Sequence, residues 1–359
     1  GKASLDDMTL VRIPPASPVT GGSVVEALSD DLEVGVSPGG RLFDSRGSFD
    51  GALQVLPFGP RIQWVMEPAI AAGAAAYIGA LTDYPGDSCQ YYVPYDGVAR
   101  PIPGVWIRGS DGARLRSMLG AGPVRVRLRV DSVRRKITSY NVVGELSGAD
   151  PEWVVIGSHH DGPWSSAVED ASGMALVFAQ ASYWSKLSAS ERPHRLVFLL
   201  NAGHMVGAAG CEAFIDTHAE ELERIVLSIH LEHAAREFVE RDGELVPSGE
   251  PETRWFFTSR NPALESSVAE ALEAEKLDRS LILAPDVFGD RPTTDGGPFH
   301  PRGVPLVNYL SAPFFLFDEI DRLDKIDEAS LVPVTRTAVR LVEATRGVTA
   351  AAMRSGVSG

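Results

Sequence analysis

Three short segments of the chain carry histidine and carboxylate side chains in patterns typical of metal ligands. His159 and Asp161 form a His-x-Asp pair directly after an apolar run, and Glu169 follows a few residues later. A third segment, residues 229–233, ends another apolar run with two histidines and a glutamate. Imidazole and carboxylate groups are common ligands of zinc and similar divalent ions. A ligating imidazole also needs a partner on its other nitrogen, a role that suits Asp161. The pattern therefore predicts a metal site.

The second half of the chain alternates between predicted strands and helices. Short apolar runs at 154–156, 196–200 and 225–229 predict strands that are covered on both faces. Longer stretches at 171–187 and 210–225 predict helices between them. This alternation favours an α/β fold, with a mostly parallel sheet flanked by helices. Ligands gather at the carboxyl ends of such strands, so the histidine and carboxylate segments should meet there.

The first third of the chain has a different texture. Residues 1–40 are rich in Pro, Ser and Gly and are expected to pack on the main domain as an N-terminal segment. Residues 41–132 contain short apolar runs broken by Pro and Gly, which predicts a β-rich α+β domain. Residues 133–359 are then expected to form a catalytic domain.

Within the β-rich part, particular elements are expected. The apolar runs 52–56, 105–107 and 124–128 predict strands, and 66–81 predicts a helix. A second helix is expected over 111–119, with Ser110 as its N-cap. The runs "AAGAAAYIGAL" and "IPGVWIRGSDGARLRSML" resemble a protease-associated domain.

Composition excludes several classes of partner. The chain of 359 residues has 33 Lys and Arg against 48 Asp and Glu, a formal net charge of −15. Nucleic acid and anionic membranes attract clustered basic residues, so neither is expected as a partner. No apolar run approaches the roughly 20 residues that span a bilayer. The substrate should be a small molecule or a peptide, and a homo-oligomer is compatible with the sequence.

The two cysteines, Cys89 and Cys211, are too few and too far apart for a disulfide framework or a thiolate zinc site. No signal-peptide pattern is visible in the sequence. On these two observations we expect a soluble protein, with a cytoplasmic location favoured.

The sequence resembles the family 28 metallopeptidases, a group of dinuclear zinc aminopeptidases and carboxypeptidases that also includes glutaminyl cyclases and the non-catalytic transferrin receptor. An inserted protease-associated domain is a known arrangement in that family. The resemblance covers residues 139 to the end, and it depends on six runs in family order: "YNVVGELSGADPEWVVIGSHHDG", "EDASGMALVFAQA", "RLVFLLNAGHMVGAAGCEAFI", "SIHLEH", "TDGGPFHPRGVPLVNYL" and "DRLDKID".

The resemblance implies a role for four residues that keep ligand chemistry. His159 takes the place of the first zinc ligand and Asp161 that of its orienting aspartate. Glu169 takes the place of the bridging aspartate, and Glu232 that of a further zinc aspartate. Family geometry assigns His159, Glu169 and Glu232 to one metal, so one half of the site is intact in chemical type.

The other half has lost its ligands. The resemblance places the paired glutamates, one the general base and the other a ligand of the second metal, on His204 and Met205. It places the last histidine ligand on Gly296. A thioether and a glycine cannot replace carboxylate and imidazole for a hard or borderline cation. We therefore expect one divalent ion, zinc first and manganese or iron as alternatives. His204 is the candidate general base, because an imidazole accepts protons near neutral pH.

Four further residues are candidates to complete the site. Strand alternation places His230 on the same face as Glu232 and turns His233 away. The helix that follows Asp170 would explain that carboxylate through N-capping alone. The additional candidates are His160, His230, His233 and Asp170.

Three functions are compatible with these residues. The leading hypothesis is a metal-dependent hydrolase of an amide or related C–N bond, with a peptide or small-molecule substrate. The alternative is a catalytically degenerate peptidase homologue that acts as a binding or scaffold protein. A third is oxidative chemistry at iron, although one histidine with two carboxylates differs from the two-histidine, one-carboxylate pattern. The coherent surviving half-site and the replacement of one base by another favour the hydrolase.

Overall fold

The computed structural model describes residues 136–356 without a break. Towards the N-terminus it describes residues 100–130 apart from 123 and 127. It also describes shorter pieces at 3–5, 9–13, 23–25, 41–43, 70, 74, 76–80, 85–87 and 98. Within the described residues, no helix is long and apolar enough to cross a bilayer.

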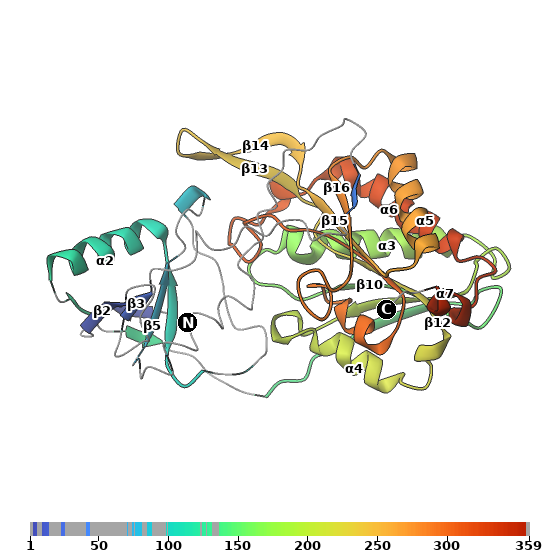
Figure 1. The fold of residues 1–359 in the computed structure, drawn as a ribbon, viewed down its shortest axis with the longest axis horizontal. Helices are drawn as coiled ribbons and strands as arrows, with labels where there is room; N and C mark the ends of the chain where they lie inside the picture. The colour runs from blue at the N-terminus through green and yellow to red at the C-terminus, as the bar shows by residue number, and fades with distance from the viewer. Residues whose placement is uncertain are drawn as a thin grey trace.

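An eight-stranded sheet forms the centre of the larger part of the molecule (Figure 1), with the strand order β4-β16-β15-β17-β12-β10-β11-β9. Its strands are β4 (Arg41–Phe43), β9 (Val142–Leu146), β10 (Trp153–His159), β11 (Arg195–Asn201), β12 (Ile225–Leu231), β15 (Arg254–Thr258), β16 (Ser280–Leu283) and β17 (Leu306–Ser311). Strand β10 pairs in parallel with β11 and β12, β12 with β17, and β15 with β16. The pairs β9–β11, β15–β17 and β4–β16 are antiparallel. The prediction of a mostly parallel sheet flanked by helices is confirmed.

Helices cover both faces of this sheet. They are α3 (Gly173–Trp184), α4 (Ala209–Thr217), α5 (Pro262–Glu275), α6 (Glu328–Ala344) and α7 (Ala350–Ser355). Every residue of β10 is buried. Val154 and Ile156 belong to the core that includes residues of α3, α5 and α6, whereas Trp153 and Val155 pack with the residues of α4 on the other face. This two-sided burial explains why the strand is apolar without alternation.

The predicted elements of the second half differ from the observed ones mainly in their ends. The helix expected over 171–187 is α3, preceded by a π-helical turn over Ala167–Ser172. The helix expected over 210–225 is shorter, because α4 ends at Thr217. There the ring Nδ1 of His218 donates a hydrogen bond to the carbonyl of Phe214, at 2.9 Å, and so satisfies a group at the helix end. A short 3-10 turn, Leu222–Arg224, then leads into β12.

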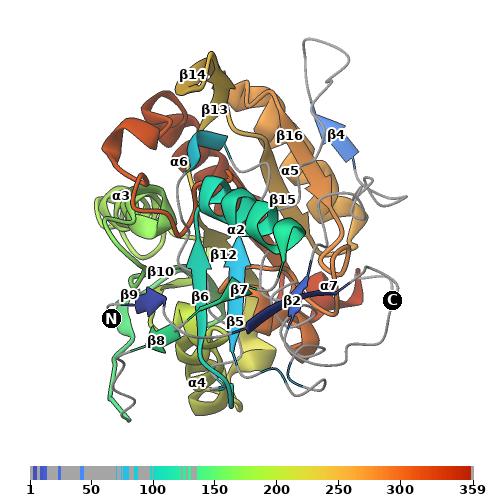
Figure 2. The same ribbon diagram turned by 90° about the vertical axis from the view of Figure 1, so that its left-hand side faces the viewer.

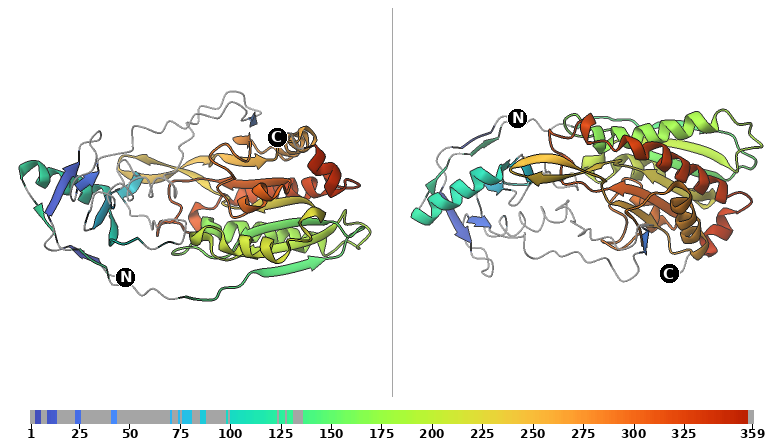
Figure 3. Two further views of the ribbon diagram at one scale, coloured as in Figure 1. Left: turned by 60° about the horizontal axis from the view of Figure 1, so that its bottom comes forward. Right: turned by 90° about the horizontal axis from the view of Figure 1, so that it is seen from above.

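Apart from β4, the labelled N-terminal elements lie at one end of the long axis (Figure 3), the end that faces the viewer in Figure 2. They contain β5 (Tyr77–Ala80) parallel to β6 (Gly104–Ile107), and the helix α2 (Gly109–Ala121). The other strands there are β1 (Ala3–Leu5), β2 (Thr9–Ile13), β3 (Ser23–Val25), β7 (Val124–Arg125) and β8 (Leu128–Val130). The strand expected over 105–107 is confirmed. The run expected as one strand over 124–128 forms two short ones, and the run 52–56 lies outside the described residues.

Two local predictions for this part are wrong. The end of the helix expected over 66–81 is strand β5, because its residues pair with β6. Ser110 does not cap α2 but lies inside its first turn. Its backbone N–H and hydroxyl both donate to the Asp87 carboxylate, at 2.8 and 2.5 Å. A carboxylate distant in sequence thus does the capping that was expected of Ser110. The assignment of residues 41–132 to a protease-associated domain stays a prediction.

A two-stranded hairpin, β13 (Arg236–Arg241) and β14 (Glu244–Pro251), extends from the main domain towards the N-terminal part (Figure 1). The N–H of Gly86, in the turn Pro85–Asp87, donates to the Glu240 carboxylate at 3.2 Å. The hairpin therefore connects the two parts of the molecule.

Candidate metal centre

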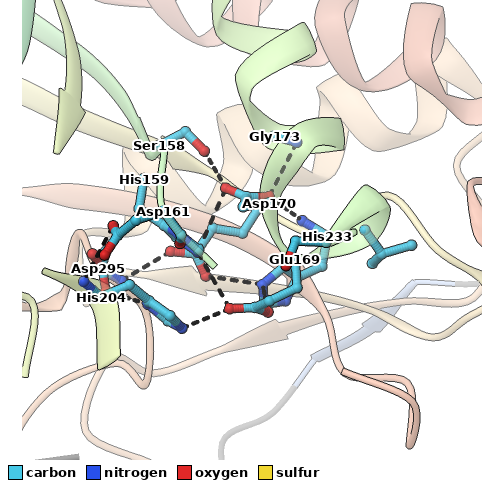
Figure 4. Close-up of polar contacts among 12 residues, drawn as sticks. Ser158, His159, Asp161, Glu169, Asp170, Gly173, His204, His233 and Asp295 are labelled. Carbon is cyan, nitrogen blue, oxygen red and sulfur yellow. Dashed lines mark hydrogen bonds and ion pairs between the residues drawn. The ribbon is translucent and has the colours of Figure 1, made fainter. Parts of the chain in front are cut away.

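Histidines and carboxylates converge where β10, β11 and β12 end (Figure 4). His159 is the last residue of β10. His204 follows β11, and both Glu232 and His233 follow β12. These strands are parallel neighbours, so their carboxyl ends meet at one edge of the sheet. The remaining member, Glu169, comes from the π-helical turn before α3.

Four buried side chains form the centre of this group. His159 Nε2 lies 3.5 Å from Glu169 Oε1, and Glu169 Oε2 lies 2.5 Å from His233 Nε2. His233 Nε2 is in turn 3.9 Å from Glu232 Oε2. Neighbouring ligands around a tetrahedral zinc ion are roughly 3.3 Å apart, given bonds of about 2.0 Å. The spacing therefore suits side chains that share one small cation.

Hydrogen bonding gives a second indication. Buried polar atoms almost always have hydrogen-bond partners. Here, five atoms of these four side chains are buried without one: His159 Nε2, both Glu169 oxygens, Glu232 Oε2 and His233 Nε2. Because these atoms are within a few ångströms of one another but not aligned as donor and acceptor, they suit a shared positive ion. The residues present therefore fit a divalent metal. Two groups of three have ligand atoms within 4.8 Å of one another: His159, Glu169 and His204, and His159, Asp170 and His233.

His159 is oriented by Asp161, but not through the expected atoms. The ring Nδ1 donates to the backbone carbonyl of Asp161 at 2.8 Å, which directs Nε2 into the cluster. The carboxylate of Asp161 instead accepts from the backbone N–H groups of Gly203 and His204, at 3.0 and 3.4 Å. It thus positions the loop after β11 rather than the ring of His159.

His233 lies in the cluster, and the inference from strand alternation that it points away is wrong. Strand β12 ends at Leu231, and His233 has a left-handed backbone with φ of 49°. The two-residue alternation therefore no longer applies there. Its Nδ1 donates to the carbonyl of Ser311 at 2.9 Å, so Nε2 faces Glu169. Burial lowers the pKa of His233, but the Glu169 carboxylate outweighs burial and raises it to about 10.

His204 lies between two carboxylates and stacks on His159. Its Nε2 is 2.6 Å from Glu169 Oε1 and its Nδ1 is 2.7 Å from Asp295 Oδ1. The rings of His204 and His159 are parallel, with centroids 3.8 Å apart. Burial lowers the pKa of His204, but the Asp295 and Glu169 carboxylates outweigh burial and hold the pKa well above its usual range. Both ring nitrogens of His204 thus face carboxylates, which favour the positively charged ring over the neutral one.

Asp295 lies in the run "TDGGPFHPRGVPLVNYL", directly before Gly296. The structure buries it and places its carboxylate against His204. Asn201 donates its side-chain N–H to the other oxygen, Asp295 Oδ2, at 2.5 Å. The backbone N–H of Asp295 donates to Glu232 Oε1 at 2.9 Å. No local sequence signal reveals that Asp295 contacts the cluster, because its hydrogen-bond partners are distant in the chain.

Asp170 accepts a hydrogen bond at the start of α3, as the N-capping explanation of this carboxylate predicts. It accepts hydrogen bonds from the backbone N–H groups of Gly173 and His233, each at 3.1 Å, and from the Ser158 hydroxyl. Its carboxylate also lies 3.8 Å from His159 Nε2. Asp170 thus connects α3 with the turn that carries His233.

Asp321 supports the loop that carries Glu169. Its two carboxylate oxygens accept from the backbone N–H groups of Val168 and Glu169, at 2.8 and 3.0 Å. Burial raises the pKa of Asp321 to about 6. The residue lies in the run "DRLDKID", which gave no specific expectation for it.

His160 and His194 lie outside the cluster. The ring Nε2 of His160 donates to the carbonyl of Tyr140 at 2.8 Å, so this candidate ligand is not brought to the site. His194 lies near the carboxylate of Asp150 in a separate group. There, Asp150 and the carbonyl of Thr345 occupy both ring nitrogens, at 2.9 and 2.8 Å. A ring with both nitrogens occupied has none left for a metal.

Met205 faces a cavity beside the cluster rather than the cluster itself. The cavity has a volume of about 320 Å³ and is lined by Asp161, Gly162, Pro163, Trp164 and Met205. Trp164 is anchored by its ring N–H, which donates to the carbonyl of Phe317 at 3.2 Å. A partly apolar space thus adjoins the candidate metal ligands.

The sheet, with the histidine–carboxylate cluster at its carboxyl edge, defines an α/β domain that carries a candidate metal centre. The sequence model of peptidase family M28 matches residues 141–342, more than half of the chain, and the chain belongs to this family. The expectation drawn from the six runs is thereby confirmed.

Individual relatives agree with this assignment. Over 174 residues the chain is 30% identical to a probable leucine aminopeptidase 2 of Aspergillus oryzae, a match that covers 46% of this chain and 31% of the relative. The zinc aminopeptidase BSAP from Bacillus subtilis has a similar structure, with a TM-score of 0.59 at 18% identity, covering 77% of this chain and 65% of that one. An aminopeptidase from Aneurinibacillus sp. strain AM-1 gives a TM-score of 0.54 at 21% identity, covering 80% and 66%. The chain thus spans about a third of the fungal relative and just under two thirds of these two bacterial proteins.

Proposed function

We propose that the chain is a hydrolase of peptide or related amide bonds that uses one divalent ion, with zinc as the first candidate. The proposed ligands are His159, Glu169, Glu232 and His233. The observation that carries the proposal is the set of five buried ligand atoms without hydrogen-bond partners. The family, and the zinc aminopeptidase among the similar structures, support the choice of metal and reaction.

When bound, the ion supplies Lewis-acid activation of water and polarises the scissile carbonyl. The protein contributes the geometry around it. Ser311 and Asp161 fix the tautomers of His233 and His159 through their backbone carbonyls. The ligand nitrogens are therefore oriented before the ion arrives, which lowers the cost of assembling the site.

His204 is the proposed proton acceptor. Asp295 holds Nδ1 of its ring, which leaves Nε2 directed at Glu169 inside the cluster. A cation held by Glu169 would offset the negative charge of this carboxylate, which is one of the two that raise the pKa of His204, and so would favour the neutral ring. Nε2 can then accept a proton from the attacking water, and Asp295 stabilises the imidazolium that results.

The adjoining cavity is the proposed site for the substrate side chain. Pro163, Trp164 and Met205 offer apolar surface, and Asp161 offers a carboxylate at one wall. A volume of about 320 Å³ lies at the lower end of typical ligand pockets. A single apolar residue of a peptide, or a small amide, fits this space.

The proposal is tested by metal content and hydrolysis measured on the same preparations. Protein purified without chelators should contain about one equivalent of metal, and it should release 4-nitroaniline from leucine 4-nitroanilide. His159→Ala should lose both the metal and the activity. His160→Ala is the matched control, because that ring lies outside the cluster. Absence of stoichiometric metal in the wild-type protein after reconstitution would favour the binding or scaffold alternative.

A further inference from the structure

His230 is a buried histidine at the centre of the sheet that the proposed function does not use. It lies on β12 and pairs with Gly157 of β10 on one side and Asn308 of β17 on the other. Its Nε2 lies 2.8 Å from Glu232 Oε1, but this buried nitrogen has no hydrogen-bond partner. The expectation that His230 and Glu232 share a face is therefore met, and the ring presents an unsatisfied nitrogen to a proposed metal ligand.

The space around His230 explains why residue 296 is glycine. A Cβ atom built on Gly296 would lie 2.5 Å from His230 Cβ and 2.6 Å from His230 Cγ. Both distances are well below van der Waals contact, and neither atom belongs to the flexible end of a side chain. The backbone of Gly296 is ordinary, with φ of −81°, so space rather than conformation demands a glycine here. The side chain of His230 thus fills the volume that any side chain at position 296 would enter.

Glu232 lies between two imidazoles. Its Oε1 faces His230 and accepts the N–H of Asp295, whereas its Oε2 faces His233 at 3.9 Å. A carboxylate in this position can share its charge between ions or ligands on both sides. An unpartnered imidazole nitrogen beside one of its oxygens therefore has the surroundings of a ligand.

We propose that His230 is a metal ligand, which supplies from strand β12 the imidazole that the family pattern places at position 296. The proposal rests on the metal site of the proposed function, and it adds a third histidine, beside Glu232 Oε1, to the proposed ligands His159 and His233. The proposal also explains why glycine occurs at position 296 together with histidine at position 230. The absence of a side chain at 296 leaves the volume that the His230 side chain fills.

The test compares the zinc affinity of variants by competition with a chromophoric chelator, together with the visible spectrum of the cobalt(II)-substituted protein. His230→Ala should weaken zinc binding by more than about 100-fold, beyond the 10–100-fold typical of residues that only orient a ligand. It should also shift the cobalt d–d bands. His230→Gln should not restore binding, although its amide can still donate to Glu232.

A double variant that exchanges the residues at positions 230 and 296 distinguishes the loss of a ligand from a folding defect. Gly296→His alone should destabilise the protein, because the two side chains collide. The double variant His230→Gly with Gly296→His should relieve the collision and recover zinc affinity to within about 10-fold of wild type, a residual loss no larger than that of an orienting residue. Circular dichroism confirms that each variant is folded.

The outcomes separate this inference from the proposed function. Wild-type protein that binds zinc and His159→Ala that does not, with His230→Ala unchanged in affinity and spectrum, would overturn the inference alone. Rescue by His230→Gln would assign His230 to orientation of Glu232 and would also overturn it. Wild-type protein that binds no zinc would overturn both.

Discussion

Asp295→Asn should invert the tautomer of His204 without removing the metal. Asn201 donates its N–H to Asp295 Oδ2 at 2.5 Å, and His204 Nδ1 lies 2.7 Å from Asp295 Oδ1. An amide at position 295 that keeps the hydrogen bond from Asn201 turns its carbonyl to Asn201, so its NH₂ group faces Nδ1. Nδ1 of His204 then has to accept a hydrogen bond from this NH₂ group, so the proton of the neutral ring moves to Nε2. A ring with its proton on Nε2 cannot take another from water there.

The magnitude follows from the role assigned to His204. General base catalysis contributes about 10²–10⁴-fold, so kcat should fall by at least about 10²-fold. None of the four proposed ligands changes, so the metal content should remain that of wild type. The assay is kcat on leucine 4-nitroanilide with metal measured on the same sample, and long-range ¹H–¹⁵N correlation spectra report the His204 tautomer.

A compensating variant makes this prediction specific. In Asn201→Asp combined with Asp295→Asn, a carboxylate at 201 accepts from the new amide, whose carbonyl then faces His204. The original tautomer and part of the activity should return. A single variant Asp295→Asn that keeps wild-type kcat and metal would refute the assignment of His204 as the proton acceptor.

Three further predictions concern stability. Asp321→Ala leaves the buried N–H groups of Val168 and Glu169 without an acceptor, so the free energy of unfolding should fall by about 2–6 kcal/mol. An unchanged midpoint of urea unfolding would contradict the role of Asp321 in supporting the loop of Glu169. Burial raises the pKa of Glu252 to about 7, so the unfolded chain ionises first as pH rises and stability is lost between about pH 4.5 and 7. Glu252→Gln should therefore stabilise the protein at pH 8 but not at pH 4. The expected gain is about 2 kcal/mol, because this side chain is partly exposed. Glu244→Gln, at an exposed position, is the control and should have no effect at either pH. Free zinc at 100 times Kd should stabilise the protein by about 2.7 kcal/mol, measured as a rise in Tm of about 3–6 °C that a chelator reverses.

The sheet could be predicted because its central strands are buried on both faces. Near-continuous apolar runs such as those of β10 and β11 are typical of strands that are covered on both faces of a sheet. The helix expected over 66–81 failed at its end, where Tyr77 and Ile78 pair with a strand more than 20 residues away. Local pattern carries no information on such pairing.

The site was predicted to different extents for different residues. His159, Glu169 and Glu232 follow strands or open a helix, so their positions could be inferred from the pattern and the resemblance. His233 was misplaced because a left-handed residue breaks strand alternation. Asp295 acts through a hydrogen bond to His204 across 91 residues, and no local signal reveals such a contact.

The position of β17 in the sheet has a consequence for the order in which the site can assemble during synthesis. This strand lies between β12 and β15, although both precede it in the chain. Until residues 306–311 leave the ribosome, β12 has an open edge beside His230 and Glu232, and Asp321 has not yet been made. Open strand edges invite incorrect pairing, so the nascent chain has a period of risk that lasts until β17 pairs with β12 and β15. The hydrogen bonds that hold His233 and the loop of Glu169 can form only after Ser311 and Asp321 have been added to the chain.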